Sequence, residues 1–218
     1  MKLNDYATIA FDCDGVILNS NQIKTRAFYT AALPYGHEGA LALKNYHTNN
    51  GGISRYKKFD WYVKTFIETE KQKEVYDALL ERYKSSVERE LATCEFNEDL
   101  IFLKEKTPNA NWLVVSGGAQ LELRQVFKAR DLDDFFEGGI FGSPDTKEAI
   151  FSREIEKSNI KLPALFIGDS KYDFTSSSKF GLDFLFLSQW SEVKDWREFC
   201  AENKISHTPS LSLIENTQ

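Results

Sequence analysis

The chain has 218 residues, of which 42% are hydrophobic and 14% aromatic, so it can bury the core of one domain and a modest insertion. Its formal net charge of -6 at pH 7 argues against a nucleic acid or an anionic membrane, which would require a basic face, and we expect neither as a partner. The sequence has no signal-peptide pattern, no apolar stretch of roughly 20 residues and only three widely spaced cysteines, which predicts a cytoplasmic protein.

The first predicted element is a buried strand over residues 7–11, ATIAF, which runs into the segment DCDG. If the strand continues, Asp12 and Asp14 project to one side and Cys13 to the other, where it would be a small core residue. Gly15 then permits a positive φ, so the chain can turn away from the sheet. Because two carboxylates this close repel each other, the segment indicates a functional site.

The next part of the chain, residues 19–95, contains no convincing buried strand and two clear helical stretches. One covers residues 56–68 and the other residues 73–93, where apolar residues recur every fourth position. This part is either a larger helical layer of the same domain or a separate helical cap. We favour a cap domain at 19–95, inserted into a core domain formed by 1–18 and 96–218.

The rest of the chain alternates short apolar runs with helical stretches. Strands are predicted over residues 111–115, 164–168 and 183–187, and helices over residues 119–132 and 146–159. This alternation predicts an α/β fold with a Rossmann-like parallel sheet. The carboxyl ends of its strands lie on one rim, where open α/β sheets bind their ligands.

Several polar residues fall on this rim. Asp169 and Asp173, in GDSKYD, add to the acids that follow the first strand, and oxygen ligands without histidine are typical of an Mg²⁺ site. Ser116 ends its strand before Gly117, so a hydroxyl and free backbone N–H groups can meet a phosphate there. Lys147 lies at the start of a predicted helix. Acids, a metal, amides and a lysine together indicate phosphoryl transfer.

Four segments, FDCDGVILNS, LVVSGG, SPDTKEAI and FIGDSKYDF, resemble the four motifs of the haloacid dehalogenase superfamily of phosphotransferases. They follow the family's order and spacing. A DxDG segment alone is weak, but the four together are specific. The helical insertion is similar to the family's C1 cap, as in β-phosphoglucomutase and phosphoglycolate phosphatase. The resemblance therefore implies a Rossmann-like core with an all-helical cap.

The resemblance also implies catalytic roles. Asp12 would be the nucleophile that forms an aspartyl-phosphate, and Asp14 would be the general acid for the leaving group and then the base for water. Mg²⁺ would be held by the Asp12 carboxylate, the backbone carbonyl of Asp14 and Asp169. Asp173 would contact these ligands rather than the metal, or would reach the metal through a water molecule.

Further residues would bind the substrate. The resemblance assigns the transferring phosphoryl group to Ser116, the Gly117 N–H and Lys147. The segment NNGGISRYKKF resembles the GxSR loop of β-phosphoglucomutase-like members, whose arginine holds a second anionic group, so Arg55 is either this contact or a residue at a helix start. Lys24 stands where the mutases carry a histidine, which favours hydrolysis, and it would contact an acidic substrate.

The sequence thus predicts a Mg²⁺-dependent phosphatase for a small phosphorylated metabolite, a sugar phosphate or an acid phosphate. One alternative is a β-phosphoglucomutase-like phosphomutase, and the other is a non-catalytic binding module on the same fold. The three histidines have no metal-ligand spacing and are expected to be structural or exposed.

Overall fold

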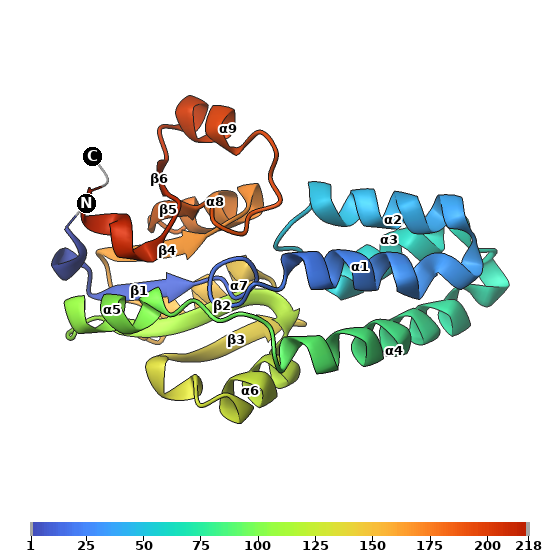
Figure 1. The fold of residues 1–218 in the computed structure, drawn as a ribbon, viewed down its shortest axis with the longest axis horizontal. Helices are drawn as coiled ribbons and strands as arrows, with labels where there is room; N and C mark the ends of the chain where they lie inside the picture. The colour runs from blue at the N-terminus through green and yellow to red at the C-terminus, as the bar shows by residue number, and fades with distance from the viewer. Residues whose placement is uncertain (1, 217–218) are drawn as a thin grey trace.

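The computed structural model describes residues 2–216, which form a parallel sheet flanked by helices, with a helical insertion between the first two strands (Figure 1). Within these residues the sheet has six strands in the order β3-β2-β1-β4-β5-β6, and all neighbouring strands are parallel. This is the doubly wound order of Rossmann-like folds. The strands are β1 (Thr8–Phe11), β2 (Asn111–Ala119), β3 (Gly139–Ser143), β4 (Ala164–Gly168), β5 (Asp183–Leu187) and β6 (Ser206–Thr208).

The central strands are buried on both faces, as their continuous apolar runs predict. All residues of β1 and β4 are buried. The strands expected at 7–11, 164–168 and 183–187 are confirmed, whereas β2 continues beyond its expected end to Ala119. Its pairing with β3 shifts register before Ala119 meets Ser143, so β2 passes the polar residue that was expected to end it.

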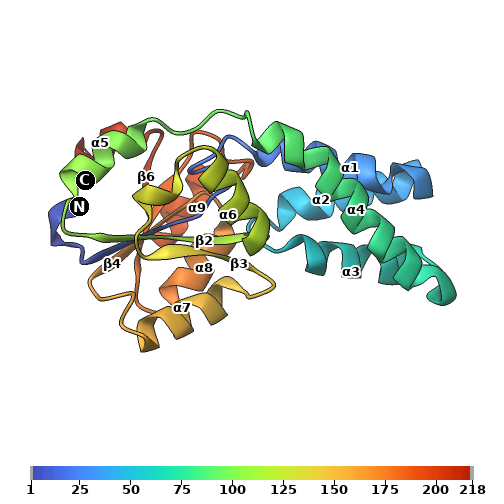
Figure 2. The same ribbon diagram turned by 90° about the horizontal axis from the view of Figure 1, so that it is seen from below.

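Helices cover both faces of the sheet (Figure 2). Two helices, α5 (Asp99–Lys106) and α6 (Gln120–Ala129), pack on one face. The opposite face carries α7 (Lys147–Glu156), α8 (Lys171–Ser178) and α9 (Trp196–Asn203). Because the two faces carry separate apolar clusters, the sheet is held rigidly and can position side chains at its strand ends.

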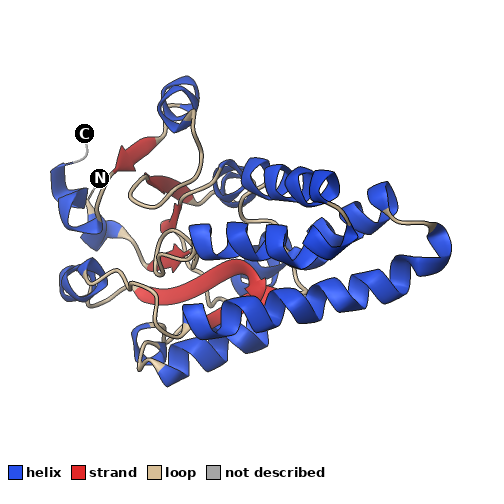
Figure 3. Ribbon diagram, turned by 45° about the vertical axis from the view of Figure 1, so that its right-hand side comes forward, coloured by secondary structure: helices blue, strands red, loops and turns tan. Residues whose placement is uncertain are grey.

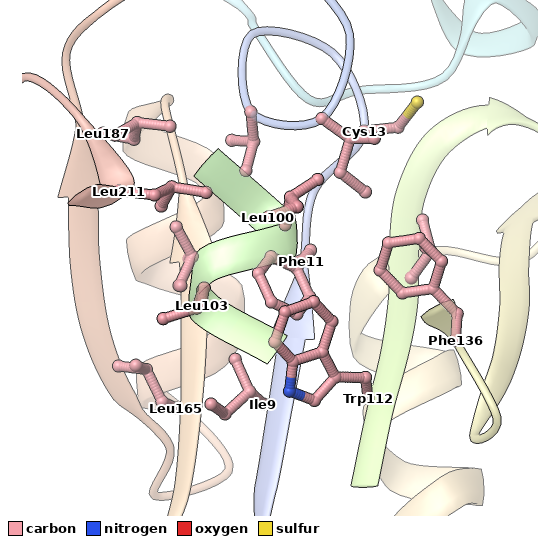
Figure 4. Packing of buried hydrophobic residues seen from close by; sticks show 14 of the residues in the cluster. Ile9, Phe11, Cys13, Leu100, Leu103, Trp112, Phe136, Leu165, Leu187 and Leu211 are labelled. Atoms are coloured by element: carbon pink, nitrogen blue, oxygen red, sulfur yellow. The ribbon is translucent and has the colours of Figure 1, made fainter. Parts of the chain in front are cut away.

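The first of these clusters is mainly aliphatic, with a group of aromatic rings at its centre (Figure 4). The rings of Phe11 and Trp112 lie 4.6 Å apart, and Phe136 packs edge-on to Phe11 at 5.7 Å. The indole N–H of Trp112 donates to the hydroxyl of Thr107 at 3.1 Å, so the buried polar end of this ring is satisfied. Cys13 is fully buried in the same cluster, which confirms it as a core residue.

The helical insertion consists of α1 (Asn21–Ala32), α2 (His37–Asn49), α3 (Arg55–Phe66) and α4 (Gln72–Leu91). These helices project from one side of the sheet (Figure 3). They share an apolar cluster of their own, which includes the expected stripe of α4. The stripe residues, all buried, are Val75, Leu79, Tyr83, Val87 and Leu91. The fold class expected from the sequence is therefore confirmed, while the domain limits 1–18, 96–218 and 19–95 stay a prediction.

None of the helices in residues 2–216 combines the length and the apolar character that crossing a membrane requires.

Candidate active site

The candidate site lies where the strand order of the sheet reverses, at the carboxyl ends of β1 and β4. The arrows of β1 and β2 point toward the helical insertion, so this rim faces α1–α4 (Figure 1). Asp12 follows β1 directly, and Asp169 follows β4. Gly15 has a φ of +76°, and a Cβ there would lie 2.1 Å from Asp169 Oδ2. Only glycine allows this turn to pass so close to the second acid.

Three buried aspartates converge at this point. One carboxylate oxygen from each of Asp12, Asp169 and Asp173 lies within 4.8 Å of the others. Burial raises the pKa of Asp12 to about 7 against the opposing effect of Lys147, and burial with Asp173 raises the pKa of Asp169 strongly. Because this cluster of acids is costly when ionised, it fits a divalent cation, and its oxygen-only donors suit a hard one.

Lys147 is the cation that the chain itself places in this cluster. Its side chain is 1% exposed, and Nζ lies 3.0 Å from Asp12 Oδ1 and 2.5 Å from Asp173 Oδ1. Although burial opposes it, the attraction of these carboxylates raises the pKa of Lys147, so the group is an ammonium. Asp173 Oδ2 accepts from the Ser170 hydroxyl at 2.8 Å and the Ser170 N–H at 3.0 Å. Both oxygens of Asp173 are thus engaged by the protein.

Asp14 lies beside the cluster of three acids but makes different contacts. Its Oδ1 accepts from the Ser20 hydroxyl at 2.6 Å and its Oδ2 from Lys24 Nζ at 2.5 Å. Burial alone would raise the pKa of Asp14, but Lys24 and Ser20 outweigh it and hold that pKa below its usual value. Lys24 therefore faces the site, and its contact with a substrate stays a prediction.

The last residues of β2 bring two glycines to the site. Gly117 and Gly118 line a cavity between the sheet and the insertion, whereas the Ser116 side chain is fully buried and its Oγ accepts from the Gly118 N–H at 3.0 Å. A Cβ on Gly117 would lie 2.2 Å from the carbonyl oxygen of Gly52, in the loop between α2 and α3. The insertion thus sits directly on the strand end.

A cavity of about 50 Å³ separates the two parts. The core contributes acids and the glycines at the end of β2 to its wall, and the insertion contributes mainly cationic and aromatic side chains. Those insertion side chains are Lys24, Phe28, His47, Arg55, Lys58 and Tyr83.

Arg55 has one of the two roles expected for it, the helix start. It is the first residue of α3 and it lines the cavity. Its guanidinium forms an ion pair with Glu122 of α6 and stacks 4.7 Å from the centre of the Tyr83 ring. The arginine is therefore already neutralised by a carboxylate of the core, and its contact with substrate stays a prediction.

Sequence reasoning missed several residues of the site. Asn21 Nδ2 donates to Asp169 Oδ2 at 2.7 Å and to the Trp190 carbonyl at 2.9 Å, which ties α1 to the core. Its place directly after the first motif was the available signal. His47 was expected to be structural or exposed, but it lines the cavity beside Lys58, and no spacing connects these two residues in the sequence.

A sequence model of haloacid dehalogenase-like hydrolases matches residues 9–187 of the chain. No curated protein is similar enough in sequence to match.

Solved structures resemble most of the chain. A β-phosphoglucomutase from Clostridium difficile has a TM-score of 0.70 at 15% identity, covering 96% of this chain and 93% of that one. A predicted phosphoglycolate phosphatase from Haemophilus somnus has a TM-score of 0.68 at 18% identity and covers 97% of both chains. A predicted phosphatase from Clostridium acetobutylicum has a TM-score of 0.67 at 18% identity, covering 88% of this chain and 90% of that one. At these identities the likeness concerns the fold alone.

Proposed function

Because the chain belongs to the haloacid dehalogenase-like hydrolases, we propose that it is a Mg²⁺-dependent phosphatase acting on a small phosphorylated metabolite. The observation that carries this proposal is the convergence of Asp12, Asp169 and Asp173 with Lys147, next to Asp14. Names of proteins with similar folds, two phosphatases and a phosphomutase, support phosphate chemistry.

The metal would be held by the carboxylates of Asp12 and Asp169 and by the backbone carbonyl of Asp14. Asp173 would not bind the metal directly, because Lys147 and Ser170 already engage both of its carboxylate oxygens; it would act through the residues that do. When bound, Mg²⁺ would offset the repulsion between an attacking carboxylate and a phosphate dianion.

Asp12 would attack the phosphorus with one carboxylate oxygen, and the bond from phosphorus to the leaving-group oxygen would break. Lys147, 3.0 Å from Asp12, would help to balance the negative charge of the transferring group. The leaving oxygen would take a proton from the hydrogen-bonded pair of Asp14 and Lys24. Water would then attack the aspartyl-phosphate, give its proton to the same pair and release phosphate.

The helical insertion would act as the cap. Because Gly52 of the insertion lies close to Gly117 of the core, the insertion would restrict the access of water to the attacking carboxylate. Exclusion of bulk water strengthens every charge interaction inside the site and limits side reactions.

Hydrolysis is favoured over the mutase reaction by the partner of Asp14. Lys24 holds Asp14 in its ionised form, which is the form that deprotonates water. A phosphomutase would instead need to protect its aspartyl-phosphate from that water.

The test is a screen of phosphorylated metabolites for release of inorganic phosphate in Mg²⁺, with the wild type beside Asp12→Asn. We expect turnover by the wild type and a loss of at least about 10³-fold in the variant, as for removal of a nucleophile. Phosphate release that survives Asp12→Asn would refute the assignment of the nucleophile. If no ester releases phosphate, and any turnover requires a phosphorylated activator, the result would favour a mutase.

A further inference from the structure

One buried cation of the cavity lacks an anionic partner. Lys58, on α3, is 2% exposed and lines the cavity. Within residues 2–216 no carboxylate lies within ion-pair distance of its Nζ. The other cations of the site differ in this respect, because Lys24 pairs with Asp14, Arg55 with Glu122, and Lys147 with Asp12 and Asp173.

Lys58 instead contacts a histidine. Its Nζ lies 2.8 Å from Nδ1 of His47, which is 8% exposed. Burial and the neighbouring Lys58 hold the pKa of His47 well below its usual value, so the imidazole is neutral and Nδ1 accepts the hydrogen bond. The imidazole proton then lies on Nε2, and this buried nitrogen has no hydrogen-bond partner in the part of the chain that the structure describes.

The acid that could neutralise Lys58 from the core is committed elsewhere. Glu192 lines the same cavity, but its oxygens accept from Gln22 Nε2 at 2.6 Å and from Thr25 Oγ1 at 2.7 Å. A buried ammonium without a carboxylate is costly, and so is an orphan buried N–H. The cost at Lys58 falls if a ligand brings an anion into the cavity.

We propose that Lys58, oriented by His47, binds a carboxylate on the leaving group of the substrate, which is therefore a phosphorylated carboxylic acid. This inference rests on the proposed phosphatase function and selects one of its substrate classes. The single charge of the Lys58 ammonium matches the single charge of a carboxylate, and His47 Nδ1, which accepts from Nζ at 2.8 Å, orients that ammonium. A second phosphate would bring more negative charge than Lys58 can balance in a cavity of about 50 Å³.

The test uses two pairs of probes in which a carboxylate is replaced by CH₂OH. The pairs are 2-phosphoglycolate with 2-hydroxyethyl phosphate, and 3-phosphoglycerate with glycerol 3-phosphate. We expect the wild type to favour the acid of at least one pair in kcat/KM by roughly 10- to 100-fold, the value of a charge-assisted hydrogen bond. In Lys58→Met this preference should fall to about one, through a higher KM for the acid.

The matched control is Lys64→Met, which removes an exposed ammonium from the same helix and should keep the wild-type preference. A readout without turnover is the thermal midpoint of Asp12→Asn in Mg²⁺, which the acid of the preferred pair should raise more than its hydroxyl counterpart. This readout also serves if Lys58→Met does not fold.

The outcomes separate the two proposals. Equal kcat/KM for acid and hydroxyl probes in the wild type would overturn the inference and leave the phosphatase intact. A preference that survives Lys58→Met would also overturn it. No phosphate release from any phosphate ester would instead refute the proposed function.

Discussion

Lys58→Met should stabilise the protein near neutral pH, and the size of the effect follows from its burial. Desolvation, with Lys24 nearby, lowers the pKa of Lys58 from 10.5 to about 7. Such a shift costs the folded state about 5 kcal/mol below pH 7, where the folded and unfolded chains are both protonated. Above pH 7 the folded state releases this proton first, so the cost falls to about 2 kcal/mol at pH 9. The substitution leaves the charged and titratable groups around Lys58 unchanged. These groups are Asp12, Asp14, Lys24, His47 and Glu192.

Methionine matches the length of the lysine stem, but it leaves Nδ1 of His47 without a donor, which costs about 1–3 kcal/mol. The net expectation for Lys58→Met is a gain of about 2 kcal/mol in the free energy of unfolding at pH 7 and almost none at pH 9. Urea unfolding at both pH values, in a chelator so that metal binding does not contribute, measures this difference. Lys64→Met, on the exposed side of the same helix, should change stability by less than about 0.5 kcal/mol at either pH. A Lys58→Met variant that is less stable than wild type at pH 7, or that differs from it equally at both pH values, would refute the reasoning.

Three further predictions concern the chemistry. Mg²⁺ should raise the thermal midpoint of the wild type but not of Asp169→Asn, and an equal rise in both would remove Asp169 from the metal site. Lys24→Met should slow phosphate release from an alkyl ester by about 100-fold but from p-nitrophenyl phosphate by less than tenfold. The reason is that only the alkyl oxygen needs a proton from the pair of Lys24 with Asp14 as it leaves. Equal losses with both esters would contradict this role of the pair as the proton donor. Gly117→Ala, whose Cβ would lie 2.2 Å from the Gly52 carbonyl, should lower kcat/KM at least tenfold, and wild-type kinetics would show that this closure is dispensable.

The central strands were predictable because they carry a strong local signal. The runs that became β1, β4 and β5 are continuous and apolar, as strands covered on both faces must be. By contrast, β3 is GIFGS, where two glycines and alternating partial burial give no such run. Its pairing depends on the neighbouring β2, which a local pattern does not contain.

The candidate site divides in the same way. Asp12 and Asp169 were found because each directly follows an apolar strand, and motif spacing located Lys147. Lys58 and His47 lie on two helices of the insertion, 11 positions apart, and meet only because α2 packs near α3. Lys58 shares the helical stripe of Phe59 and Tyr62 on α3, which was the available signal for its burial, but that local pattern does not show that His47 of α2 meets it.

The contacts of α1 separate the chemistry of the site from its selectivity. The first turn of α1 is tied to the core by Asn21, which donates to Asp169 and the Trp190 carbonyl, and by Gln22 and Thr25, which donate to Glu192. Lys24 is therefore fixed on Asp14 by the same anchors that hold α1.

Lys58 and His47 stand outside this anchored turn, on α3 and α2. Neither contacts an acid of the core through a hydrogen bond or ion pair in the described part of the chain, so their positions depend on how these helices close over the rim. Substitutions in the anchored part should therefore change mainly kcat, whereas substitutions of Lys58 should change mainly KM and the choice of leaving group. A family that keeps the strand ends and varies α2 and α3 could change substrates in this way without disturbing the acids that perform the reaction.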